Sequence, residues 1–145
     1  MNGKDFNEVV SLILREDRRY DRNAYFFIRE ALDYTVKRER KPRGGAVNRH
    51  VNGRVLSLGI RDFALEQYGP MAATLFAQWG IRVTSDFGEI VYNLVDYNVF
   101  GTQPGDRRQD FDGVFDFFEA FQKPFLPARR MAQQRTEVTT PNNAG

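Results

Sequence analysis

Hydrophobic residues recur at helical spacing along the first half of the chain. Asp5 and Glu8 have the spacing of a capping box, and the apolar stripe that follows begins at Phe6. Further stripes with a period of about 3.6 residues run along residues 23–38 and 55–68. Because an amphipathic helix buries one face, these three segments predict a core that is built mainly from helices.

Two shorter helices are predicted next, at residues 70–79 and 86–97. Gly80 between them suits a left-handed C-terminal cap, which glycine adopts without steric cost. The N-terminal cap of the second helix would be Thr84, Ser85 or Asp86. Two helices joined by a four-residue turn have the outline of a helix-turn-helix, which we expect over residues 70–100.

The pattern changes after Gly101. Residues 111–117 alternate between Phe or Gly at one set of positions and Asp or Val at the other, which is the period of a strand. The polar run before them would form the tip of a β-hairpin over residues 99–117. A helix-turn-helix followed by a hairpin predicts a winged-helix-like C-terminal half. The expected fold class is therefore α+β, mainly α with a small C-terminal β-hairpin.

Length and composition indicate one globular domain. The chain has 145 residues, of which 41% are hydrophobic and 28% are charged, as in ordinary soluble proteins. We expect this domain to cover residues 1–121 and the polar residues 122–145 to form a disordered tail. No segment has the roughly 20 apolar residues of a membrane span, and the first apolar run is too short for a signal peptide. We expect a cytoplasmic protein with no membrane contact.

Positive charge is concentrated in residues 37–54. The whole chain has a net charge of +2, whereas this stretch has seven Lys or Arg residues and one acid, Glu39. Pro42, Gly44 and Gly45 favour a loop here. Cations in such a loop neutralise phosphates without reading bases, although a solvated loop or an acidic protein partner would also suit them. The predicted phosphate contacts are Arg38, Arg40, Lys41, Arg43, Arg49 and Arg54, with Arg107 and Arg108 at the hairpin tip.

The helix at 86–97 has the wrong charge for entering a DNA groove. No Lys or Arg occurs between Thr84 and Pro104, and an acidic helix repels a duplex. Its acids and tyrosines are more typical of a protein-docking face. The alternative function is therefore a protein-interaction module, associated with the ribosome or with transcription, that uses the acidic helix 86–97 and the aromatic hairpin.

Few residues have catalytic potential. The chain has no cysteine and one histidine, His50, which excludes thiol catalysis and thiolate zinc sites. Asp86, Phe87 and Gly88 spell the metal-binding triplet of protein kinases, but the other kinase loops are missing, so we assign them to capping and core. We expect His50 to form a structural bond or to contact a phosphate. No catalytic residue, metal or cofactor is expected.

Three long strings resemble one bacterial family. They are residues 24–38 (AYFFIREALDYTVKR), residues 49–100 (from RHVNGRVLSLGIRDF to IVYNLVDYNVF) and residues 106–121 (DRRQDFDGVFDFFEAF). Together they resemble the small conserved signature family of planctomycetes, verrucomicrobia and their relatives, over roughly residues 6–121. That family has no established activity, and the resemblance implies a housekeeping role with nonspecific nucleic-acid binding. The expected function is a non-enzymatic, sequence-tolerant protein that binds DNA or RNA through phosphates.

Overall fold

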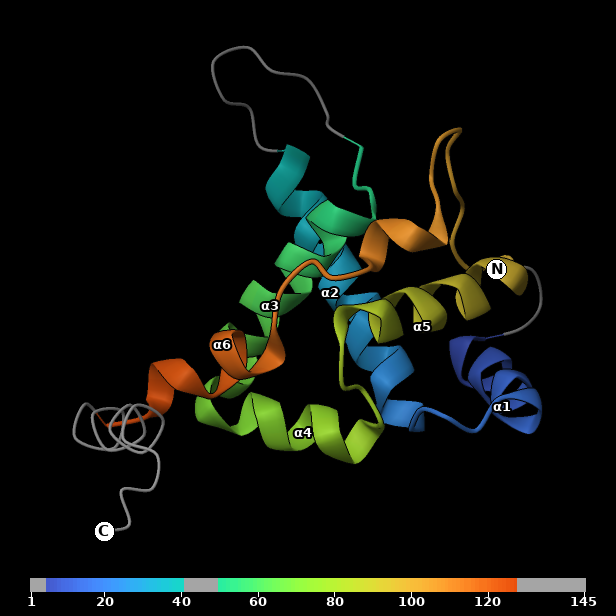
Figure 1. The fold of residues 1–145 in the computed structure, drawn as a ribbon. Coiled ribbons are helices and arrows are strands. Elements are labelled where there is room, and N and C mark those ends of the chain that lie inside the picture. The colour runs from blue at the N-terminus through green and yellow to red at the C-terminus, as the bar shows by residue number, and fades with distance from the viewer. Residues whose placement is uncertain (1–4, 41–49, 128–145) are drawn as a thin grey trace, which may run out of the picture.

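The computed structural model describes residues 5–40 and 50–127, and these ranges fold into a bundle of helices (Figure 1). The α-helices are α1 (Phe6–Glu16), α2 (Arg22–Arg40), α3 (Gly53–Tyr68), α4 (Ala72–Trp79), α5 (Thr84–Asp96) and α6 (Phe117–Phe121). Within the same described ranges, three single-turn 3₁₀-helices accompany them, η1 (Gly69–Met71), η2 (Arg108–Phe111) and η3 (Lys123–Phe125).

The first three predicted helices are confirmed. The capping box of α1 is complete, since the Glu8 amide donates to Asp5 Oδ1 at 2.8 Å and the Asp5 amide donates to Glu8 Oε1 at 3.3 Å. α3 begins two residues earlier than predicted because Asn52 caps it, with its Oδ1 accepting from the Val55 amide at 2.9 Å. α2 and α3 pack against each other along the long axis of the bundle (Figure 1).

The two shorter helices are also confirmed as α4 and α5. Gly80 ends α4 with a φ of +85°, and a Cβ at this position would lie 2.4 Å from the Arg19 carbonyl oxygen, so only glycine fits. The N-cap of α5 is Val83, one residue before the predicted candidates. Asp86 still caps the helix from its first turn, since its Oδ2 accepts from the amides of Arg82 and Val83 at 2.8 and 3.1 Å.

The predicted β-hairpin over residues 99–117 is wrong. Residues 5–40 and 50–127 contain no strand, so the α+β fold class and the winged-helix-like C-terminal half are both corrected to an all-helical fold. η2 and α6 occupy the C-terminal part of the proposed hairpin. The alternation of Phe and Asp has another cause. Phe111 fills a gap between two glycines, and Asp116 caps α6 by accepting from the Glu119 amide at 3.0 Å.

Phe111 locks η2 onto the bundle. Its ring lies where a side chain at Gly53 of α3 or Gly88 of α5 would be, because a Cβ at either glycine would approach a ring carbon to 2.9 Å. Thr84 adds a polar link, since its hydroxyl donates to the Phe111 carbonyl at 2.6 Å. The segment after α5 is therefore held by single insertions into the helices, not by a strand ladder.

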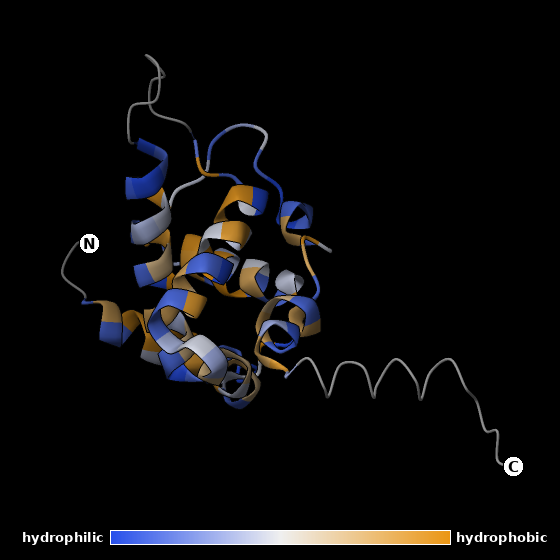
Figure 2. Cartoon of the chain, turned by 90° about the vertical axis from the view of Figure 1, so that its left-hand side faces the viewer, coloured by the Kyte–Doolittle hydropathy of each residue, from blue (hydrophilic) through white to orange (hydrophobic). Residues whose placement is uncertain are grey.

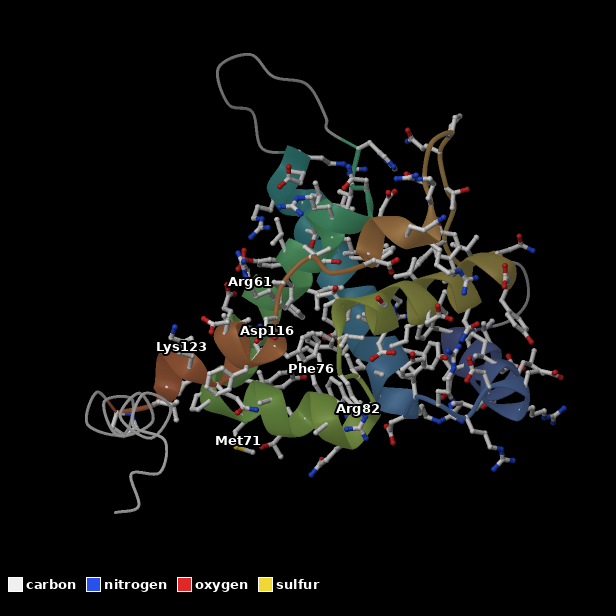
Figure 3. All side chains as sticks on the ribbon, in the orientation of Figure 1. Arg61, Met71, Phe76, Arg82, Asp116 and Lys123 are labelled. Carbon is white, nitrogen blue, oxygen red and sulfur yellow. The ribbon has the colours of Figure 1, made fainter. Side chains whose placement is uncertain are left out.

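An aromatic cluster forms the centre of the core. Phe76 of α4 lies in the middle of the molecule (Figure 3), with its ring centroid 5.1 Å from that of Phe121 and 5.8 Å from that of Phe87. All three side chains are buried. Hydrophobic residues face the centre of the bundle and polar residues its outside (Figure 2). The high Phe content of the sequence is thus used mainly inside the fold.

The described chain extends a little past the predicted domain end at residue 121. η3 continues it to Phe125, and residues 128–145 of the predicted tail lie outside the described residues. Within the described ranges, no helix combines the length and the apolar character that crossing a membrane requires.

Candidate nucleic-acid interface

One end of the bundle gathers several of the predicted cationic positions. The last turn of α2, the start of α3 and the loop after α5 meet there, at the top of Figure 1. An open groove of about 490 Å³ lies between them. Its lining includes Leu32, Val36, Arg40, His50, Val51 and Gln103. The groove lining therefore combines aliphatic side chains with a cation and other polar groups.

A smaller cavity of about 60 Å³ adjoins the groove behind His50. Leu32, His50 and Val51 line both spaces, and Arg107 and Tyr92 line only the inner one. The outer groove is the larger of the two spaces, so it is the one that an extended chain could enter.

His50 ties the two walls of this site together. Its Nε2 lies 2.8 Å from Asp106 Oδ1, and Asp106 Oδ2 accepts from the Gln103 amide at 2.8 Å. The bond links the segment before α3 to the loop after α5, so the structural bond expected for His50 is present. Asp106 also folds its own loop, because its amide donates to the Gln103 carbonyl at 3.0 Å.

Arg38 points away from the groove into an ion pair. Its Nη1 donates to Asp62 Oδ2 on α3 at 2.8 Å, and its guanidinium lies 5.3 Å from the centre of the Tyr34 ring. The hydrogen bond that Arg38 donates to Asp62 raises the pKa of Arg38. Burial alone would raise the pKa of Asp62, but the hydrogen bonds from Arg38 and Arg61 outweigh it and lower that pKa. The Arg38 side chain thus links α2 to α3 through Asp62.

Arg107 and Arg108 also have acidic partners. Arg107 Nη2 lies 3.2 Å from Asp110 Oδ1, where Arg107 caps η2. Arg108 Nη1 lies 3.0 Å from Glu89 Oε1 on α5, and its guanidinium is 5.1 Å from the centre of the Tyr92 ring. Arg107 still lines the inner cavity, whereas Arg108 faces α5. The structure therefore does not bring these two arginines together with the other predicted cations as one surface.

Arg40 and Arg54 are also exposed at this end. Neither forms an ion pair with any acid within residues 5–40 and 50–127. Arg40 lines the groove, and Arg54 is on the first turn of α3. The other predicted contacts, Lys41, Arg43 and Arg49, lie outside the described residues.

The acidic helix of the alternative function has internal partners for most of its polar residues. Asp86 Oδ1 accepts from the Tyr20 hydroxyl at 2.5 Å, and Glu89 Oε1 accepts from Arg19 Nη2 at 3.1 Å as well as from Arg108. Asn93 Nδ2 donates to Asp17 Oδ2 at 3.0 Å. This face of α5 therefore bonds other segments of the same chain. The aromatic hairpin that the protein-interaction hypothesis also requires is absent from the described ranges.

Sequence inspection missed these bonds because the partners are far apart in the chain. Asp17 and Asn93 are separated by 76 residues, and no local spacing connects them. Burial of Tyr20, together with its bond to Asp86, raises the pKa of the Tyr20 hydroxyl. Hydrogen bonds from Arg19 hold the pKa of Asp17 well below its usual range. The closeness of Asp17 and Arg19 in the sequence indicates that these two side chains can pair. It gives no sign that Asn93 also bonds Asp17.

The remaining chemical candidates have structural roles. Asp86 caps α5, Phe87 is fully buried, and Gly88 makes room for Phe111, as the sequence interpretation of this triplet proposed. Within residues 5–40 and 50–127, no three His, Cys, Asp or Glu residues are placed to hold a metal ion together.

The chain matches no family model, and neither curated proteins nor solved structures include a significant match to it. The resemblance to the planctomycete and verrucomicrobial signature family therefore stays a prediction. The argument for a function depends on the site itself.

Proposed function

We propose that this chain is a non-enzymatic protein that binds DNA or RNA through phosphates, with little dependence on base sequence. The observation that supports the proposal most is the placement of Arg40 at an open groove, with Arg54 exposed at the same end of the bundle. Charges without an acidic partner attract phosphates most strongly, because no internal ion pair has to be broken first.

The groove itself favours contacts that tolerate many sequences. Its lining includes the aliphatic side chains of Leu32, Val36 and Val51 beside the polar side chains of Arg40, His50 and Gln103. The aliphatic side chains accept sugars and base faces without the bidentate hydrogen bonds that distinguish one base from another. Arg40 would supply the phosphate contact, and Arg54 would extend it across the start of α3.

The interface is narrower than the one that the sequence predicts. Arg38 and Arg108 form ion pairs with Asp62 and Glu89, and binding phosphate with them would leave these acids without a partner. Arg107 can contribute more, because its Nη2 is the nitrogen that bonds Asp110 and its side chain is 66% exposed.

The test is removal of the two exposed cations as Arg40→Gln with Arg54→Gln. Binding of a fluorescent single-stranded oligonucleotide is measured by anisotropy at low and at physiological salt. We expect the affinity of the wild type to fall steeply as the salt concentration rises. The double variant should bind roughly tenfold more weakly at low salt. Its plot of log affinity against log salt concentration should also be less steep, by up to about two released ions.

A matched control removes two cations far from this end, as Arg82→Gln with Lys123→Gln. Both residues lie at the other end of the bundle (Figure 3), and the net charge changes equally. The control should keep wild-type affinity. The proposal fails if the wild-type chain does not bind at low salt, or if the two double variants lose affinity equally while thermal melts show them folded.

A further inference from the structure

The junction of α1 and α2 is rich in arginine, with four arginines against three acids in residues 15–22. It lies at the opposite end of α2 from the groove. At 1.5 Å per residue, these two ends of α2 are about 27 Å apart. Neither the sequence prediction nor the proposed function assigns a role to this junction.

The four arginines fall into two classes. Arg19 is neutralised, since its Nη2 lies 2.7 Å from Asp17 Oδ2 and 3.1 Å from Glu89 Oε1. Arg15 and Arg18 are exposed and form no ion pair with an acid in the described ranges. The junction therefore keeps two exposed charges beside a third arginine, Arg22.

Arg22 is held in place by neutral groups only. Its Nη1 donates to Asn7 Oδ1 at 2.7 Å, and its Nη2 donates to Ser11 Oγ at 2.8 Å. Asn7 and Ser11 stand one turn apart on α1, so they fix the guanidinium against that helix. Neutral partners orient an arginine without cancelling its charge, which leaves Arg22 positioned for an anion.

These side chains surround an open hollow of about 440 Å³. It is lined by Ser11, Leu14, Arg15, Arg18, Asp21 and Arg22, together with the Tyr20 ring. Asp21 is the one acid of this lining, and its Oδ2 already accepts from the Asn23 amide at 2.8 Å. Three cations against one capped carboxylate give the hollow a net positive charge.

We propose that this hollow binds a phosphate group, held by Arg15, Arg18 and Arg22. The planar guanidinium fork matches two oxygens of a phosphate, which an ammonium cannot do. Arg22 is fixed in advance by α1, and Arg15 and Arg18 close on the anion from the two sides of the junction. Leu14 and the Tyr20 ring provide an apolar wall for whatever carries the phosphate.

The test is titration of inorganic phosphate, followed by amide and arginine side-chain signals in NMR at constant ionic strength. We expect saturable shifts confined to residues 11–23. The variant Arg15→Gln with Arg18→Gln should weaken binding roughly tenfold or more, because each charge-assisted contact contributes a large share of the affinity. Both residues are exposed and make no contact that the fold requires, and a thermal melt confirms that the variant is folded.

The control Lys37→Gln with Lys123→Gln removes two exposed cations that lie away from the junction, and it should bind phosphate like the wild type. The proposal is overturned if no saturable shift occurs at residues 11–23, if chloride at equal ionic strength reproduces the shift, or if the Arg15 and Arg18 substitutions leave the phosphate affinity unchanged.

The source of the phosphate is distinguished by a second titration with a single-stranded oligonucleotide. Shifts at residues 11–23 that the Arg15 and Arg18 substitutions abolish would identify a nucleic-acid backbone as the ligand. Shifts with inorganic phosphate alone would identify a phosphorylated small molecule. The Arg40 and Arg54 variant should keep the phosphate shifts in either case, so failure of the proposed function and failure of this site are told apart.

Discussion

The two sides of α5 are held by different kinds of interaction. One side packs Phe87 against the aromatic cluster of α4 and α6, where ring centroids lie 5.1 to 5.8 Å apart. The other side forms hydrogen bonds to the α1–α2 junction and to η2, through Asp86, Glu89 and Asn93. The apolar side supplies most of the burial, and the polar side determines which segments lie beside the helix.

This difference explains why an acidic helix need not be a docking face. Apolar contacts tolerate substitution, because different hydrophobic side chains of similar volume can fill the same space. Hydrogen bonds require one particular partner at one distance and angle. The acids of α5 are therefore best understood as the means by which a helix late in the chain orients α1 and α2.

The largest effect should come from the apolar side. Phe76→Ala would empty the centre of the aromatic cluster, and truncation of a buried Phe costs about 3–5 kcal/mol of the free energy of unfolding. Urea denaturation measures this directly. Phe118→Ala is the matched control, since Phe118 is 40% exposed, and it should cost less than about 1 kcal/mol. Equal costs for the two variants would show that the cluster is not the centre of the core.

A smaller effect is expected from the polar side with Asp17→Asn. Asp17 accepts from the Arg19 side chain and from Asn93, and it is largely shielded from solvent. Loss of its charge should cost about 1–2 kcal/mol at pH 7. The control is Asp33→Asn, because Asp33 is exposed and its one ion pair in the described part of the chain is with Lys37 of its own helix. About 0.5 kcal/mol or less is expected for this control.

The Asp17 contribution should also depend on pH in a defined direction. Hydrogen bonds from Arg19 hold the folded-state pKa of Asp17 below its usual range. The ionised Asp17 carboxylate therefore stabilises the fold at pH values above the unfolded-state pKa of about 4. This stabilisation is lost as pH falls through and below that value. The difference in unfolding free energy between wild type and Asp17→Asn should therefore shrink between pH 7 and pH 3. A difference that stays constant over this range would contradict the assignment.

The sequence predicts the apolar side of this comparison far better than the polar side. The stripes that contain Ile13, Ile28 and Leu94 are buried as expected, because helical periodicity is a local property. The hairpin prediction failed at Phe111, since alternation cannot distinguish a strand from single side chains that fill gaps at Gly53 and Gly88. Such gaps exist only after distant helices have packed.

The candidate site was predictable only in its location on the chain. Charge density marks residues 37–54, and Arg40 and Arg54 are exposed at one end of the bundle. That Arg38 pairs with Asp62 follows from the packing of α2 on α3, which no local spacing encodes. The stretch 15–22 has four arginines and three acids in the sequence, and only the fold shows that Arg19 pairs with Asp17 while Arg15, Arg18 and Arg22 line one hollow.

The smallest effect is expected where η2 meets α5, with Arg108→Gln. The Arg108 side chain is 49% exposed and lies 3.0 Å from Glu89 Oε1, so solvent screens the pair and it should contribute below about 0.5 kcal/mol. Urea denaturation of the single variants and of the double variant with Glu89→Gln isolates the pair. Glu89 also accepts from Arg19, which should keep α5 bonded to the α1–α2 junction when Arg108 is absent. A coupling energy above about 1.5 kcal/mol would instead make η2, and not the α1–α2 junction, the main partner of this side of α5.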